Sequence, residues 1–427
     1  MNSYSGPGSP TELASKDRFG DRIHVGLACG MLAFLPVNGE IAGVLLIPLL
    51  AWALVRTACW PGYLPSAPGV VMIPAIGWIG FLAASMIWTP DLREARFSLW
   101  QQWPVVLVPV LWPILAHWRV LLGCVVAGAL AQATFHSISI LAVGFEKETL
   151  GFAGLGEHPR RLAVWYAATA VGIVAFLLTG QLRRWLWLVA VLVLAAPILL
   201  SNSRAALIAM ILGFGVVTVL AFVRHGVNRR RLLAAMACGV IVGGSLLAFG
   251  GPVARGLQNA WTRTVETVSN DQPEDIRLAW WRSSARQWQT RPMLGFGLGG
   301  AERALETDSK LIVETEDDTR LRAARLAYGH PHSTYFQILV EGGIVGIGLF
   351  AWLIGTIAAT AYRTSGRHPV GILALGVLAV WMVAATTDEW YVIGHLLSML
   401  WIAAVLAPFD PHWLEDDPGS KSPKPES

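Results

Sequence analysis

Apolar runs about as long as a membrane-spanning helix recur along almost the whole chain, and no other feature limits its possible folds as strongly. A helix needs about 20 residues to cross about 30 Å of hydrocarbon, where the backbone must pair its own polar groups. Hydrophobic residues make up 54% of the 427 residues and charged residues only 14%, which excludes an ordinary soluble protein. Strand-type alternation is absent from the sequence, so we expect an all-α integral membrane protein with about twelve spans. The expected spans are residues 23–38, 40–56, 69–88, 98–117, 120–144, 162–180, 185–201, 205–223, 232–250, 333–361, 369–387 and 390–408.

The basic residues predict which way the helices cross the membrane. Lys and Arg in short loops resist translocation, so the loops that hold them stay in the cytoplasm. One side collects Lys16, Arg18, Arg22, Arg56, Arg119, Arg183, Arg184, Arg224, Arg229 to Arg231, Arg363 and Arg367. We therefore expect both termini in the cytoplasm, with residues 1–22 and 409–427 as disordered tails. The net charge of +4 reflects this bias and does not indicate nucleic-acid binding.

The external side carries one long loop, residues 251–332. It separates the first nine expected spans, within residues 23–250, from the last three, within residues 333–408. A plain connection between helices needs far fewer residues, and long loops that persist are commonly functional. We therefore look for the chemistry of the protein on this side of the membrane.

Within this loop, residues 274–291 predict an amphipathic helix at the membrane surface. The stretch EDIRLAWWRSSARQWQTR contains no Gly or Pro, opens with acidic residues and is followed by Pro292. One face would hold Arg277, Trp281, Ser284 and Trp288. The tryptophans Trp280, Trp281 and Trp288 would anchor this helix at the interface or stack on sugars. In the glycine-rich turn PMLGFGLGG that follows, the backbone could approach a ligand, or the glycines serve the turn alone.

The segment YGHPHSTYFQILVEGGIVG places two histidines just ahead of the tenth expected span. His332 would stand at the external mouth of this helix, and Gly343 would lie three helical turns further along the same stripe. Gly342 and Gly346 have the spacing of close helix packing. His330 is a weaker candidate, and two histidines around one proline do not make a zinc site. Glu341 would be buried about 13 Å below His332, where it must be paired, protonated or lining a cavity.

Arginines at the external boundary form the second unusual feature. Arg204, in SNSRAALIAM, interrupts two apolar runs, so it needs a partner, either lipid phosphate or a bound anion. Arg277 is a second external arginine, and Arg160 with Arg161 form a third group at the start of the sixth span. If they converge in space, their planar guanidinium groups suit a diphosphate.

These residues resemble the motifs of a known family. The run H-S-x9-G-x-x-G from His332 to Gly346 resembles the signature of the O-antigen ligase and polymerase superfamily. The motif S-x-S-R that ends at Arg204 is similar to the arginine motif of these proteins. The pattern R-x-x-x-W from Arg277, followed by PMLGFG, resembles a segment of their large periplasmic loop. The likeness covers about residues 70–405 and includes the order of the motifs.

The resemblance implies a GT-C-like glycosyltransferase of the bacterial inner membrane whose active site faces the periplasm. Such an enzyme takes a glycan from undecaprenyl diphosphate and needs no nucleotide sugar, metal ion or other cofactor. By this likeness His332, Arg204 and Arg277 are the functional residues. Arg160 stands where relatives often have Asn, which leaves the role of its loop open.

The expected chemistry follows from a donor that already carries a good leaving group. Arg204 and Arg277 would neutralise the charge on the departing diphosphate, and His332 would accept the proton of the attacking hydroxyl. Direct attack would invert the anomeric carbon. We expect the acceptor to be lipid A-core, so that the enzyme is an O-antigen ligase surrounded by membrane lipids. A polysaccharide polymerase or a protein O-oligosaccharyltransferase would share the donor. A polar-lipid transporter fits less well, because the charged residues gather at one boundary and no repeat is visible.

Overall fold

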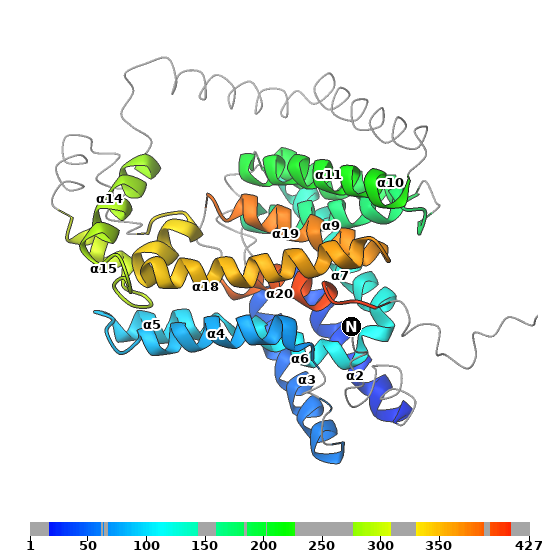
Figure 1. Ribbon diagram of the computed structural model, residues 1–427. Coiled ribbons are helices and arrows are strands. Elements are labelled where there is room, and N and C mark those ends of the chain that lie inside the picture. The colour runs from blue at the N-terminus through cyan, green and yellow to red at the C-terminus, as the bar shows by residue number, and fades with distance from the viewer. Residues whose placement is uncertain are drawn as a thin grey trace, which may run out of the picture.

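The computed structural model describes residues 17–60, 63, 67–143, 159–182, 186–201, 203–226, 276–308, 330–387 and 393–410. Every regular element in these ranges is helical, as the sequence predicts, and Figure 1 shows the helices gathered into one bundle. The helices of the N-terminal half are α2 (Arg18–Phe34), α3 (Gly39–Cys59), α4 (Gly69–Ser85), α5 (Leu92–Trp100), η2 (Trp103–Val106), α6 (Leu107–Leu111), η3 (Trp112–His117), α7 (Trp118–Val143) and α9 (Pro159–Leu178). Those that follow are α10 (Leu186–Leu200), α11 (Arg204–His225), α14 (Ile276–Thr290), α15 (Ala301–Glu306), α18 (Thr334–Ser365), α19 (Pro369–Ala384) and α20 (Gly394–Leu406).

Four helical stretches of the described chain are long and apolar enough to cross a membrane. They are Gly39–Cys59, Leu92–Ala142, Ala205–His225 and Thr334–Ser365. Five shorter apolar helices accompany them: Gly69–Ser85, Leu162–Leu178, Leu186–Leu200, Pro369–Ala384 and Leu396–Leu406. The expected span 232–250 lies outside the described residues, and every other expected span coincides with helical structure. The protein is therefore a multi-pass helical membrane protein.

Two sequence expectations about helix limits need correction. Residues 98–117 do not form one helix, because the chain breaks there into α5, η2, α6 and η3. Pro104 and Pro113 each stand in the first turn of a new 3-10 segment, since proline lacks an N–H group and clashes with the preceding turn. The first helix also begins at Arg18, inside the stretch expected to be a disordered tail.

Hydrogen bonds between neighbouring helices define two ends of the bundle. At one end the Thr334 N–H donates to the Ala385 carbonyl oxygen over 2.9 Å. At the other end His225 Nε2 lies 2.9 Å from the Ser365 carbonyl oxygen, and Thr364 Oγ1 donates to Ala407 over 2.6 Å. We call the end that holds Thr334 and Ala385 the His332 end, and the end that holds His225 and Ala407 the opposite end. In Figure 1 the His332 end lies on the left, beside α14 and α15.

Candidate functional site

His332 lies in a turn that precedes α18, and its backbone is left-handed. Its φ is 47°, and it is the one non-glycine residue with a positive φ among the described residues. The next residue, Ser333, is the N-cap of α18. The expectation that His332 and Gly343 share one helical stripe is therefore wrong. A side chain in this conformation costs on the order of 1–3 kcal/mol and persists only where its surroundings enforce it.

Two tryptophans of α14 enclose the turn that holds His332. The Trp280 indole stacks on the imidazole of His332, with ring centroids 4.6 Å apart and planes inclined by 28°. Trp281 Nε1 donates to the Pro331 carbonyl oxygen over 3.1 Å, and its ring stacks on Phe336 at 5.5 Å. The helix predicted over residues 274–291 is confirmed as Ile276–Thr290. Its tryptophans contact the protein and thereby position the histidine.

Helix α14 is itself fixed to the end of α15 by a buried carboxylate. Asp308, which is 6% exposed, accepts hydrogen bonds from Ser283 Oγ at 2.5 Å and from Arg286 Nη2 at 2.8 Å. Ser283 is fully buried. This contact fixes the helix that carries Trp280, so the position of His332 depends on the whole packed unit of residues 276–308.

The glycine-rich turn, residues 292–300, joins α18 through backbone hydrogen bonds. Helix α18 breaks at Gly343, where φ is 59° and ψ is −156°. Four hydrogen bonds to the turn satisfy the groups released by the break: Phe296 N to Val340 O, Gly297 N to Glu341 O, Ile344 N to Pro292 O and Val345 N to Met293 O, at 2.8 to 3.1 Å. We call this arrangement the backbone interlock. It joins the PMLGFG and H-S-x9-G-x-x-G motifs into one structure.

Glycine is required on both sides of the backbone interlock. A Cβ atom on Gly343 would lie 2.4 Å from the Met293 carbonyl oxygen, and one on Gly295 would lie 2.4 Å from that of Val340. Gly343 therefore makes a break, which corrects its expected role in helix packing. Gly342 and Gly346 do pack closely, as predicted, because Cβ atoms there would lie 3.0 and 3.1 Å from the ring of Phe81.

Glu341 is held by hydrogen-bond donors within the same structure. The residue is 3% exposed, and its carboxylate accepts from Gln337 Nε2 at 3.2 Å. The backbone N–H groups of Gly299 and Ala301 also donate to it, and Ala301 opens α15. These hydrogen bonds pair the carboxyl group of Glu341 with its surroundings, which is one of the three alternatives left open by the sequence, and they fasten the turn to α18.

Several buried polar atoms near His332 have no hydrogen-bond partner in the described part of the chain. They are Trp280 Nε1, Ser284 Oγ and His330 Nδ1. Ser284 is fully buried and follows Trp280 by one helical turn. A buried polar group without a partner costs about 1–3 kcal/mol, so the fold bears this cost close to His332. His330, expected as a supporting residue, precedes His332 by two residues and is half-buried.

Glu94 is a further polar residue of this end that the motifs in the sequence did not single out. The carboxyl group interacts electrostatically with His330 and with Glu302, although Glu94 lies far from both along the chain. Gly299 also packs against α5 here, since a Cβ atom on it would lie 2.6 Å from the backbone nitrogen of Ala95. Its place in the charged segment WTPDLREAR, near the boundary between two expected spans, is the signal that could have indicated it.

The backbone of Arg204 lies at the His332 end, at the start of α11. Helix α11 runs antiparallel to α19, because Gly213 faces Val380 whereas Val217 faces Gly376. The first turn of α11 therefore approaches the end of α19, which bonds to Thr334 through Ala385. The side chain of Arg204 lies outside the described residues.

The other predicted arginines belong to helices that also begin at this end. Arg160 and Arg161 lie in the first turn of α9, whose far end places Phe176 against Trp118 and hence beside His368 at the opposite end. Arg277 is one helical turn before Trp280 in α14. The side chains of these three arginines are also outside the described residues. The structure thus brings the starts of three helices, α9, α11 and α14, and His332 to one end.

The described residues contain no group of three or more His, Cys, Asp or Glu side chains that could hold a metal ion. The comparison with protein families assigns the chain more directly. Residues 189–351 match the family described as O-antigen ligase. This match over part of the chain supports membership of the O-antigen ligase superfamily. The match contains Arg204, Arg277, His332 and both partners of the backbone interlock, so this O-antigen ligase relative carries its family motifs at the His332 end. Membership indicates a membrane enzyme of the ligase or polymerase type. None of the curated proteins matches its sequence.

Proposed function

We propose that this O-antigen ligase relative transfers a polysaccharide from undecaprenyl diphosphate to lipid A-core on the periplasmic face of the bacterial inner membrane. One observation carries the proposal. His332 is fixed against Trp280 at 4.6 Å, at the end of the bundle where the helices of Arg204, Arg277, Arg160 and Arg161 begin. Both termini and the opposite end then face the cytoplasm, in a GT-C-like arrangement of about twelve spans.

His332 acts as the general base in the proposed reaction. The acceptor hydroxyl oxygen attacks the anomeric carbon of the donor sugar while the imidazole takes the hydroxyl proton. A positioned base of this kind contributes about 10²- to 10⁴-fold to the rate. Stacking on Trp280 holds the imidazole in one orientation, which favours proton transfer because the geometry of attack is set before the acceptor binds.

The arginines act on the leaving group. The bond between the anomeric carbon and the diphosphate oxygen breaks, and the electron pair leaves with undecaprenyl diphosphate. Guanidinium groups of Arg204 and Arg277 stabilise the charge on this oxygen, and Arg160 and Arg161 bind the second phosphate. Inversion at the anomeric carbon follows from a single displacement. His330, which is half-buried, is a supporting candidate for contact with the substrate.

Purified protein supplied with an undecaprenyl-diphosphate-linked glycan and lipid A-core tests the proposal. We expect His332→Ala and Arg277→Ala to lower the transfer rate at least 100-fold, whereas His330→Ala lowers it less than tenfold. Wild-type transfer by properly inserted His332→Ala and Arg277→Ala would refute the mechanism.

The acceptor is tested separately in a strain that lacks its ligase. The wild-type chain should restore capped lipopolysaccharide. Glycan that lengthens only on its own carrier, or that appears only on protein, would replace the ligase assignment by a polymerase or an oligosaccharyltransferase with the same donor.

A further inference from the structure

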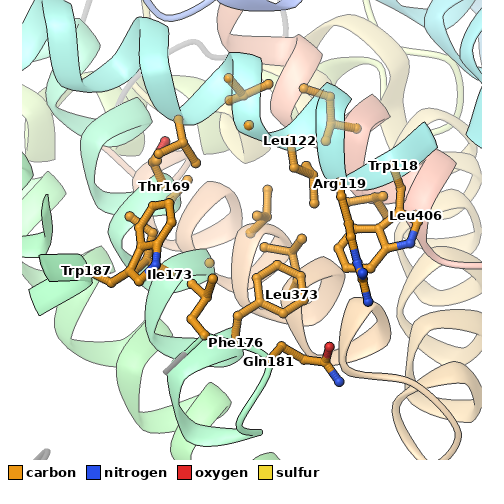
Figure 2. A pocket seen from close by; sticks show the side chains of 18 of the residues that line it. Trp118, Arg119, Leu122, Thr169, Ile173, Phe176, Gln181, Trp187, Leu373 and Leu406 are labelled. Carbon is orange, nitrogen blue, oxygen red and sulfur yellow. The ribbon is translucent and has the colours of Figure 1, made fainter. Parts of the chain in front are cut away.

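One cavity of the described chain lies toward the opposite end, away from His332. It has a volume of about 330 Å³, within the range of small-molecule sites in proteins. Its walls come from α7, α9, α10, α19 and α20 and are almost entirely apolar, as Figure 2 shows. Among the lining side chains are Leu122, Ile173, Phe176, Trp187, Leu373 and Leu406. A cavity with these walls suits a hydrocarbon chain.

Two polar side chains lie at one margin of this cavity. Arg119 is the second residue of α7 and Gln181 follows the end of α9, so both are at the opposite end of the bundle. Figure 2 shows the two side chains beside the apolar wall. Arg119 is exposed, and its guanidinium group lies 5.3 Å from the ring of Trp118. No carboxylate of the described residues forms an ion pair with it.

The surroundings of Arg119 are cationic. Arg119 and His225 both act electrostatically on His368, whose ring lies 5.4 Å from that of Trp118. Arg224 is next to His225 and lies over the ring of Tyr362. This local excess of positive charge complements an anionic headgroup. Basic pockets between membrane helices on the cytoplasmic side are typical sites for anionic lipids.

We propose that the cavity binds one anionic phospholipid of the cytoplasmic leaflet. One acyl chain fills the apolar space, the phosphate contacts Arg119, and the Gln181 amide donates a hydrogen bond to the headgroup. The site is distinct from that of the proposed glycan donor. Arg160 and Gln181 stand at the two ends of α9, about 30 Å apart along its axis, which is the thickness of the hydrocarbon layer. The phospholipid would join α7 and α9 to α19 and α20 in one leaflet.

Gly123 offers a way to close the cavity without disturbing the fold. It lines the cavity, and a Cβ atom on it would meet no atom within 4 Å. Gly123→Leu therefore places a side chain in the space proposed for the acyl chain. Gly215→Leu is the matched control, because Gly215 is equally open and exposed on α11, away from the cavity. Arg119→Gln removes the headgroup contact, and Arg22→Gln is its control, since Arg22 is exposed on α2 near the same end.

Binding of phosphatidylglycerol and phosphatidylethanolamine to the purified, delipidated protein is measured by native mass spectrometry and by the thermal unfolding midpoint. We expect one phosphatidylglycerol to bind in preference to phosphatidylethanolamine and to raise the midpoint of the wild type. Arg119→Gln should weaken its binding about fivefold. Gly123→Leu should abolish it, while both controls bind as the wild type does.

Three results would overturn the proposal. The first is equal binding of the two phospholipids, and the second is wild-type phosphatidylglycerol binding by both Arg119→Gln and Gly123→Leu. The third is displacement of phosphatidylglycerol by undecaprenyl phosphate in a manner that depends on Gly123, since the cavity would then hold the carrier lipid. If Gly123→Leu does not fold, the binding of phosphatidylglycerol by Arg119→Gln still tests the proposal. None of these measurements involves glycan transfer, so failure here leaves the proposed enzyme activity untouched.

Discussion

Trp280 lies against His332 with its indole nearly parallel to the imidazole, at 4.6 Å between ring centroids and 28° between planes. The two residues belong to segments that are far apart in the chain, α14 and the turn before α18. Because the backbone of His332 has a left-handed φ of 47°, neighbouring residues of α18 do not determine where its ring points. The orientation of the proposed base therefore depends on a tryptophan of α14.

Replacement of Trp280 tests this dependence. We expect Trp280→Ala to lower kcat for glycan transfer on the order of 100-fold with little change in KM, because small misplacements of a catalytic group cost this much. Trp280→Phe keeps a ring beside the imidazole and should retain kcat within tenfold. Leu278→Ala, at an exposed position of the same helix, serves as the control. A Trp280→Ala enzyme with normal kcat would show that His332 is oriented by other contacts.

The backbone interlock predicts opposite effects for two glycines of α18. Gly343→Ala should lower the thermal midpoint by several degrees and remove transfer activity, since its Cβ would lie 2.4 Å from the Met293 carbonyl oxygen and its φ is 59°. Gly348→Ala meets no atom within 4 Å, so it should be neutral or stabilise the helix by about 0.5–1 kcal/mol. Midpoints of the purified variants in detergent distinguish the two, and equal midpoints would contradict the interlock.

Two ion pairs of the same loop differ in burial and should differ in importance. Asp308→Ala leaves Arg286 and the buried Ser283 without their acceptor, so we expect a loss of about 3 kcal/mol in the free energy of unfolding. The pair of Arg303 and Glu306 is exposed, at 68% and 53%, and joined at 3.7 Å. Glu306→Ala should therefore change stability by less than about 0.5 kcal/mol. Denaturant titration of both variants provides the measurement, and comparable losses would argue against a fixed α14.

His368 predicts a loss of stability in mild acid. It caps α19 through Nδ1, which accepts from the Val370 N–H at 3.3 Å. Burial, followed by the nearby charges of Arg119 and His225, lowers the pKa of His368 from 6.5 to about 4. The unfolded chain therefore binds this proton first, and the contribution to stability is complete above pH 6.5 and declines as the pH falls toward 4.

A titration of the thermal midpoint between pH 7 and pH 5 measures this effect. His368→Asn keeps a side chain that caps helices and does not titrate, so its midpoint should fall less over this range than that of the wild type. Identical slopes for the two proteins would place the acid sensitivity at other groups.

Hydropathy and local composition predicted those parts of the fold that depend on local sequence. Apolar runs located the membrane helices because length and apolarity are themselves what a bilayer selects. The absence of Gly and Pro located α14 to within two residues at its start. The three prolines between residues 104 and 113 favour a broken helix, so they account for the breaks that replace the single span expected over residues 98–117.

The candidate site was less predictable because distant backbone segments build it. A glycine pair at 342 and 343 fits either close packing or a break, and only the position of Met293 decides between them. Besides Gln337, the donors to Glu341 are the backbone N–H groups of Gly299 and Ala301, which no side-chain pattern reveals. The arginines were identified because a guanidinium group at an apolar boundary costs free energy. The structure describes the starts of their helices but not their side chains.

The break in α18 also bears on the order in which the protein is made. Residues 334–365 form one helical stretch that is long and apolar enough to cross a membrane. The turn of residues 292–300 pairs with both sides of the break, so this pairing needs residues 340–345 to be in place. We therefore expect biogenesis to have two stages, placement of the helices in the bilayer and then completion of the histidine end. A defect in the second stage would yield a protein of normal abundance and normal topology that cannot transfer a glycan.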